Sequence, residues 1–421
     1  MRQYESYKDS GIQWLGKIPS HWISRKLRYS CVITDGTHYS PATTESGMPY
    51  ITVSNVHNDI IDLEHANKIS LKDYENLVKQ GCQPQIGDVL LAKDGTVGRT
   101  AVVTKNNEYV VLSSLGIIHP MNGISSTFLK YSLDSMFLQE QMAAAMAGSA
   151  LRRITISKIN EFISLVPPLS EQLTIASYLD YKVGQIDSVI AEKEKMLADL
   201  RVYRSSVISE AVTKGLNKNV PMKNSGIDNI GLVPYHWSLV KMKFISNLQS
   251  GSNLTSEEIM DSGLYPVYGG NGIRGYFNEY NTEGSFVLIG RQGALCGNIN
   301  YADGKFWATE HAVVCHPRTE YDVVWFGSLL EIMNLNQYSI SSAQPGLSVE
   351  RIENLLIPVP PIEEQKMIGE YIGVKGKTIE LAINELLSQI EDLKSYKSSV
   401  ITEAVTGKVD LREWNKQIVT A

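Results

Sequence analysis

SGIQWLGKIPSHW, residues 10–22, returns as SGIDNIGLVPYHW at residues 225–237. The two copies keep serine, glycine, isoleucine, glycine, proline, histidine and tryptophan in register. A second motif, VPPLSEQ at residues 166–172, returns as VPPIEEQ at residues 359–365. The segments that follow it close alike, on YRSSVISEAVT (203–213) and YKSSVITEAVT (396–406). This duplication predicts two similar units across an approximate two-fold axis, a geometry suited to a target that itself has two halves.

Each VPP motif opens a segment in which apolar residues recur at alternating spacings of four and three. Such a stripe over more than four heptads is typical of a coiled-coil seam. Each helix would be about 40 to 45 residues, roughly 60–68 Å, long. One apolar stripe cannot be buried alone, so we expect the two helices to pair antiparallel; a purely structural coiled coil without a spacing role is the alternative. The seam comprises Leu179, Ile186, Ile190, Leu197, Leu200 and Val207, then Ile372, Ile379, Ile383, Ile390, Leu393 and Val400.

The remaining sequence indicates mixed α/β units with irregular sheets. Short β-rich runs lie between glycine-bearing turns, and each unit has one late apolar helix candidate. The expected strands include Tyr50–Val56, Asp88–Ala92, Thr100–Val103, Ser285–Ile289 and His311–Val314, and the expected helices are Thr127–Met146 and Asp322–Leu335. The predicted domains are a globular unit (1–165), a helix (166–216), a second globular unit (217–358), a second helix (359–409) and a tail (410–421).

Composition excludes several classes of protein. No run of 18 uncharged apolar residues is present, which favours a cytoplasmic protein. The four cysteines are scattered without a CxxC pair, so neither a disulfide framework nor a zinc site is expected. Residues 1–169 carry 16 basic and 15 acidic side chains, and residues 215–362 carry 9 and 13. Neither unit has the basic excess that drives strong binding to phosphates, so binding to DNA would need help from a partner.

The catalytic motifs of the common nucleotide- and metal-dependent enzymes are absent. The sequence contains no GxxxxGK[ST] phosphate loop, HExxH metal helix, GxSxG elbow or [ND]PP[YF] tetrapeptide of amino-methyltransferases. Glu364 and Lys366 form an isolated ExK, which is weak evidence for a nuclease. We therefore interpret the chain as non-catalytic, without metal or cofactor of its own.

Several loops carry side chains that suit contacts with nucleic acid. Arginine and lysine address phosphate or guanine, and glutamine addresses adenine. In the alternative interpretation, the glycines only form tight turns and the charges are solvated. The candidates are His38, Lys93, Arg99, Arg152, Arg153, Arg274, Arg291, Gln292 and Gln344. His21, Trp22, His236 and Trp237 recur across the duplication, which favours packing against the helices over base contact.

Together these motifs resemble the specificity (S) subunit of type I restriction-modification systems, an HsdS-like protein. The resemblance rests on SGIxxxGxxPxHW, the DGTH turn, GDVLLAKDGTVGR and VPPLSEQ in the first half, and on YPVYGGNGIRGYF, GRQGALCGN and WATEHA in the second. It covers nearly the whole chain. It implies two target recognition domains that each read one half of an interrupted double-stranded DNA site, joined by conserved helices on which two methyltransferase (M) subunits dock.

The resemblance also implies where the chemistry resides. The M subunits would methylate adenine with S-adenosylmethionine, and separate restriction (R) subunits would supply ATP- and Mg2+-dependent translocation and cleavage. The rival hypothesis is an adaptor scaffold in which two binding modules on a coiled coil organise proteins. That scaffold explains the seam equally well, but it gives no reason for divergent inserts on matching flanks.

Overall fold

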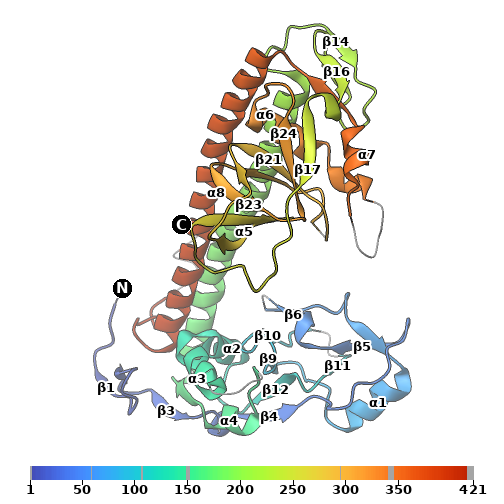
Figure 1. Cartoon of the computed structure of the whole chain (residues 1–421). Coiled ribbons are helices and arrows are strands. Elements are labelled where there is room, and N and C mark those ends of the chain that lie inside the picture. The colour runs from blue at the N-terminus through green and yellow to red at the C-terminus, as the bar shows by residue number, and fades with distance from the viewer. Residues whose placement is uncertain are drawn as a thin grey trace. The chain divides into compact units, whose positions relative to one another are not determined.

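The computed structural model describes residues 2–57, 59–105, 108–147, 152–293, 295–339 and 346–414. The chain divides into unit 1 (Met1–Glu194 and Ser388–Ala421) and unit 2 (Lys195–Leu387). Two long helices, α5 (Leu169–Lys214) and α8 (Ile362–Val405), each contribute one part to unit 1 and one part to unit 2 (Figure 1). The predicted mixed α/β class with two long helices is confirmed. In the described ranges, no helix is long and apolar enough to cross a membrane.

Unit 1 is centred on an antiparallel sheet with the strand order β10-β9-β12-β4. A smaller sheet, β11-β5-β8, contains the parallel pair β11 and β5. Its strands are β1 (Tyr7–Asp9), β2 (Lys17–Pro19), β3 (Ile23–Lys26), β4 (Cys31–Asp35), β5 (Met48–Ile51), β6 (Val56–His57), β7 (Ile60–Ile61), β8 (Asn67–Ile69), β9 (Val89–Ala92), β10 (Thr100–Val102), β11 (Val110–Val111), β12 (Leu115–Pro120) and β13 (Ile163–Val166). Its helices besides the long pair are α1 (Leu71–Lys79), α2 (Ser126–Asp134), α3 (Met136–Met146) and α4 (Ile156–Glu161).

Unit 2 repeats this plan. Its main antiparallel sheet has the order β17-β24-β21-β22, and a second sheet, β19-β18-β23-β20, contains the parallel pair β18 and β23. Its strands are β14 (Met222–Asn224), β15 (Leu232–Pro234), β16 (Ser238–Lys241), β17 (Ser246–Ser250), β18 (Tyr265–Gly269), β19 (Gly272–Phe277), β20 (Thr282–Glu283), β21 (Phe286–Gly290), β22 (Ile299–Ala302), β23 (Lys305–Ala308), β24 (Ala312–Pro317) and β25 (Leu356–Val359). Its helices besides the long pair are α6 (Val323–Ile332) and α7 (Val349–Glu353).

The long helices run antiparallel within unit 1. Ile186 and Ile190 of α5 pack with Ile390 and Leu393 of α8. Lys193 Nζ donates to Gln389 Oε1 at 2.6 Å, whereas Asp187, earlier in α5, accepts from Lys397, later in α8. The partner number falls as the residue number rises, which is the signature of an antiparallel pair. Polar pairs at such seam positions fix register at some cost in stability.

Two predicted elements differ from the structure for local reasons. The expected strand Tyr50–Val56 ends at Ile51, because Thr52 and Asn55 exchange hydrogen bonds as the capping box of a 3-10 turn. The expected helix Thr127–Met146 is two helices, α2 and α3, that meet at Ser135 in an extended conformation. The backbone amide of Met136, which the break leaves without a helical partner, donates to Thr402 Oγ1 at the end of α8.

Candidate nucleic-acid interface

The duplicated sequence motifs form one carboxylate site in each unit. In unit 1, Glu171 at the start of α5 accepts a hydrogen bond from the Trp22 indole at 3.1 Å, and its other oxygen lies 2.7 Å from His21 Nε2. In unit 2, Glu364 at the start of α8 accepts from the Trp237 indole at 3.1 Å and lies 2.8 Å from His236 Nε2. The prediction that these histidines and tryptophans pack against the helices is confirmed.

The glutamine that follows each of these glutamates anchors a second helix. Gln172 accepts a hydrogen bond from the backbone amide of Ser125, whose hydroxyl caps α2. Gln365 accepts from the backbone amide of Asp322, whose carboxylate caps α6. The Glu-Gln pair of each VPP motif therefore connects the long helix to the His-Trp motif and to the apolar helix, α2 or α6, of its unit. We call these repeated contacts the frame.

Three loops meet at one edge of the main sheet in each unit. In unit 1, the loop after β4 meets the strand β11, because Thr37 N donates to Val111 O at 2.9 Å. Gly36 permits this approach, since a Cβ at that position would lie 2.2 Å from Val111 O. The loop after β9 joins them through Lys93 N, which donates to Ser114 O at 2.9 Å. Two of the segments that sequence analysis singled out, the DGTH turn and the start of the KDGTVGR loop, thus meet in one cluster.

Lys93 lies inside this cluster. Its side chain is 1% exposed, and its ammonium is 3.1 Å from Asp35 Oδ1. His38, which is exposed, lies 3.3 Å from the other oxygen of the same carboxylate. A buried lysine needs such a partner, because an unpaired buried charge costs several kcal/mol. This burial argues against direct DNA contact by Lys93, whereas His38 remains a surface candidate.

The other basic candidates of unit 1 lie on the surface. Arg153 pairs with Asp94 at 3.2 Å, and these residues also form an isolated antiparallel bridge. Arg152 and Arg99 are exposed. The ion pair of Arg153 with Asp94 offsets part of the positive charge that Arg99, Arg152 and Arg153 bring to the surface of unit 1.

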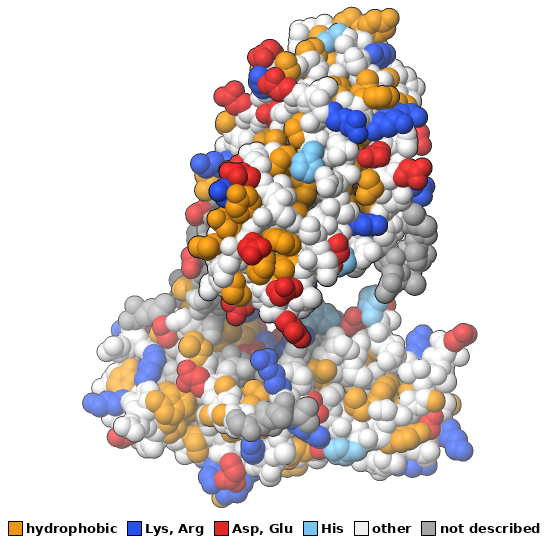
Figure 2. All heavy atoms as spheres, viewed as in Figure 1, with side chains coloured by type: hydrophobic (Ala, Val, Ile, Leu, Met, Phe, Trp, Pro, Cys, Tyr) orange, Lys and Arg blue, Asp and Glu red, His pale blue; other side chains and the backbone are white. Residues whose placement is uncertain are grey.

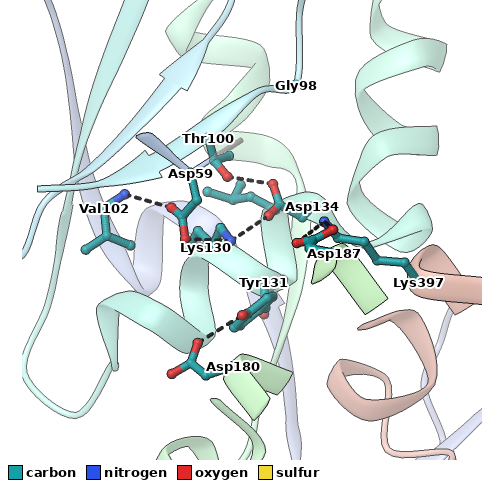
Figure 3. Close-up of polar contacts among 12 residues, drawn as sticks. Asp59, Gly98, Thr100, Val102, Lys130, Tyr131, Asp134, Asp180, Asp187 and Lys397 are labelled. Carbon is teal, nitrogen blue, oxygen red and sulfur yellow. Dashed lines mark hydrogen bonds and ion pairs between the residues drawn. The ribbon is translucent and has the colours of Figure 1, made fainter. Parts of the chain in front are cut away.

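Arg99 borders a groove of about 830 Å³ between α2 and the long helices of unit 1. Inside it, Lys130 lies 2.9 Å from Asp59 and 3.4 Å from Asp134 (Figure 3). Burial raises the pKa of the Asp134 carboxyl, against the opposing effect of Lys130. Burial alone would lower the pKa of Lys130, but the two carboxylates raise it above its ordinary value. The cluster holds the β6–β7 turn on α2, because Asp59 belongs to that turn.

We call the edge of the main sheet where these loops meet the loop edge. At the loop edge of unit 2, the backbone makes the equivalent hydrogen bonds but the side chains differ. Arg291 follows β21 as Lys93 follows β9, and its amide donates to His311 O at 2.9 Å. Its guanidinium is half-buried and donates to Ser250 Oγ at 3.3 Å. Gln292 and Arg274 are exposed. Gln344, the remaining candidate, lies outside the described residues.

The predicted seam is occupied by the chain itself. Leu179, Ile186, Ile190 and Leu197 of α5 are buried, as are Ile372, Ile379, Ile390 and Val400 of α8. The other predicted seam residues, which are half-buried, are Leu200, Val207, Ile383 and Leu393. In unit 1, Ile186 and Ile190 pack against Ile390 and Leu393 of the chain's own second helix. Other apolar residues of α8, such as Val374 and Leu381, are exposed.

The surface agrees with the weak charge predicted from composition. On the face shown in Figure 2, basic and acidic side chains are interspersed over each unit instead of gathering into one basic patch. Among the residues that the structure describes, no group of three or more His, Cys, Asp or Glu side chains could hold a metal ion.

Sequence reasoning missed the side chains that set the charge of the loops. Asp35 was recognised in the sequence only as part of a turn. Its pairing with Lys93 joins residues 58 positions apart. The strand order that brings them together cannot be read from one sequence. No sequence motif pointed to Ser250 or Lys130 as residues that set the charge of the loops. Aligning the two copies strand by strand would have matched Asp35 with Ser250 and so pointed to the difference.

Comparison with known proteins gives a consistent result. A family model described as type I restriction modification DNA specificity domain matches residues 30–195 and 234–392. The type I restriction enzyme EcoprrI specificity subunit of Escherichia coli is 40% identical over 163 residues, which are 38% of this chain and 40% of that protein. The EcoKI specificity subunit of E. coli strain K12 is 24% identical over 94% of this chain and 90% of its own length.

A solved structure adds the fold. A chain from work on complex assembly and conformational transition of the type I R-M system matches with a TM-score of 0.70 and 17% identity. The match covers 93% of this chain and 99% of that chain.

Proposed function

Because the chain belongs to the type I restriction-modification DNA specificity family, we propose that each of its units reads one half of a bipartite DNA sequence. In that role the chain is the DNA specificity subunit of a larger complex. It recognises the site and leaves the chemistry to its partners.

The observation that supports two different half-sites is the contrast between frame and loops. Glu171 and Glu364 bind the same pair of side chains in the two units. The loop edges keep the same backbone hydrogen bonds but present Lys93 with Asp35 in one unit and Arg291 with Ser250 in the other. Base sequence is read by side chains, so units with a shared backbone and unlike side chains suit two unlike half-sites.

The partners follow from the same proposal. Two methyltransferase subunits would dock on the outward faces of α5 and α8 and bring S-adenosylmethionine, and restriction subunits would bring ATP and Mg2+. The assembly would methylate adenine and cut DNA, while this chain itself catalyses neither step. Such a complex would act on DNA in the cytoplasm. Nonspecific attraction to phosphates would come largely from the partners, because neither globular unit carries a basic excess.

The decisive experiment is methylome sequencing of cells that carry this gene with its methyltransferase partner, against cells that lack this gene alone. We expect one bipartite adenine-methylated motif that disappears with the deletion. An unchanged methylome would contradict the proposed function and favour the adaptor scaffold.

A second experiment tests whether α5 and α8 set the gap between the half-sites. Lys193 faces Gln389, so seven residues inserted after Glu194 and seven before Ser388 lengthen both helices at one level and keep the heptad phase. Seven residues add about 10.5 Å of helix, or about three base pairs at about 3.4 Å each. We expect a longer gap with both half-sites unchanged, and a changed half-site would refute the spacing role. An insertion in one helix only is the control that should disrupt the pair.

A further inference from the structure

Lys93 and Arg291 occupy the same position in the two units. Each follows a buried strand of the main sheet, β9 or β21. Each donates its backbone amide across the loop edge at 2.9 Å, to Ser114 O or to His311 O. Each also accepts a hydrogen bond at its carbonyl, from Ile154 N at 2.8 Å or from Leu347 N at 2.9 Å. The backbone therefore delivers one cationic side chain to the same place in both units.

The residues that face these cations are equivalent as well. Asp35 ends β4, and Ser250 ends β17. A glycine follows each of them and passes close to a backbone carbonyl, Gly36 at Val111 and Gly251 at Ala308. The duplication therefore places an aspartate opposite the cation in unit 1 and a serine in unit 2.

This difference changes the charge that each loop edge presents. The Lys93 side chain is 1% exposed and its ammonium lies against the Asp35 carboxylate, which is 26% exposed, so the two charges offset each other. The Arg291 side chain is half-buried, and its guanidinium donates to the neutral hydroxyl of Ser250. In the described part of unit 2, no Asp or Glu forms an ion pair with Arg291, and Glu310 of the same loop edge pairs with His311 at 3.2 Å.

We infer that Arg291 is the cation of this duplicated position that contacts duplex DNA, and that Lys93 has become a structural ion pair. The inference rests on the proposed function and identifies the residue that acts in unit 2. The ligand group is an acceptor oxygen or nitrogen, from a backbone phosphate or from the O6/N7 edge of guanine, and arginine suits both. The hydroxyl of Ser250 orients the guanidinium without neutralising it.

The test uses the full chain assembled with its methyltransferase subunit and a duplex that carries the motif found by methylome sequencing. Arg291→Ala should weaken binding roughly 10- to 100-fold, the range expected for loss of one bidentate arginine contact. Arg318→Ala is the matched control. Arg318 also donates to a neutral side chain, Asn247, but near the opposite end of the β17–β24 pair. Equal effects of the two substitutions would overturn the inference.

Two further measurements separate the sources of the contact. If Arg291 binds phosphate, Arg291→Ala weakens all duplexes alike and lowers the salt slope by about one. If it binds guanine, the substitution relaxes specificity at one position of one half-site, and Arg291→Lys does not restore it. Absence of any bipartite motif with the unaltered chain would instead refute the proposed function, so the two failures are distinguishable.

The reciprocal exchange tests unit 1. The double substitution Asp35→Ser with Lys93→Arg installs the unit 2 pair and should release a cation, which raises affinity for random-sequence duplex several-fold and steepens its salt dependence. Circular dichroism confirms that the variant is folded. An unchanged affinity of a folded variant would show that this position does not face DNA and would overturn the inference.

Discussion

The two units share a frame and differ in how they neutralise charge. Glu171 of unit 1 is 4% exposed and also accepts from the Tyr4 hydroxyl, whereas Glu364 of unit 2 is 18% exposed. On α2 the buried Lys130 is held by two carboxylates, and at the matching place on α6 Gly327 makes room for the Tyr301 ring. Matching positions of the two duplicated backbones thus carry different charged and uncharged contacts.

The largest effect is expected at the frame of unit 1. Glu171→Ala leaves the buried donors of Trp22 and Tyr4 without an acceptor, removes the partner of the exposed His21, and should lower the free energy of unfolding by about 3–5 kcal/mol. Glu364→Ala, at the more exposed copy, should cost about 1–2 kcal/mol. Urea unfolding measures both, and equal losses would break the comparison. Glu363→Ala is the control, because that neighbouring carboxylate is 80% exposed and pairs with Lys366 at 3.4 Å.

The second prediction concerns the buried lysine of unit 1. Lys130→Met removes the cation that pairs with Asp59 and Asp134. It should lower the free energy of unfolding by about 2–4 kcal/mol at neutral pH. Burial raises the pKa of the Asp134 carboxyl in the folded state, so without the opposing cation the loss should shrink as pH falls and Asp134 takes up a proton. A pH-independent loss would contradict the charge argument. Lys394→Met, on the rim of the same groove, should leave stability unchanged.

The third prediction tests the corresponding place in unit 2. A Cβ on Gly327 would lie 2.4 Å from ring atoms of Tyr301, so Gly327→Ala should lower the free energy of unfolding by about 1–3 kcal/mol. Adding Tyr301→Val should recover part of this loss, because the clash disappears. Thermal unfolding of the two single variants and the double variant gives the coupling free energy between positions 327 and 301. If the two losses of stability simply add, the Tyr301 ring is not the obstacle.

The smallest effect concerns two equivalent histidines. His119 lies 2.7 Å from Asp88, whereas His316 stacks edge-on against the Phe286 ring, and burial lowers the pKa of His316. The unfolded chain therefore binds a proton at His316 more readily, so its contribution to stability is present above the ordinary pKa of 6.5 and is lost as pH falls below it. In the isolated chain, His316→Asn should make the free energy of unfolding depend less on pH between about pH 5 and 7. An unchanged profile would show that another group governs it.

Much of the architecture was readable because it follows from repetition and periodicity. The heptad pattern predicted both long helices, and the recurring His-Trp motif predicted packing against them, which the contacts of Glu171 and Glu364 confirm. Local chemistry that competes with periodicity was not readable in advance. Ser135 divides one predicted helix, where its hydroxyl donates to Ser132 O, and one predicted strand ends before Thr52, whose backbone amide donates to the Asn55 side chain.

Motif identity and spacing can be read from a linear chain, so they were enough to predict the duplication, the helical pair and the family. Which loop charges are paired became clear from the three-dimensional contacts. Lys93 and Arg291 look alike in sequence, and their difference arises from Asp35 and Ser250 on another strand. Whether a charge is available depends on what lies within a few ångströms in space, because electrostatic attraction falls with distance and not with sequence separation.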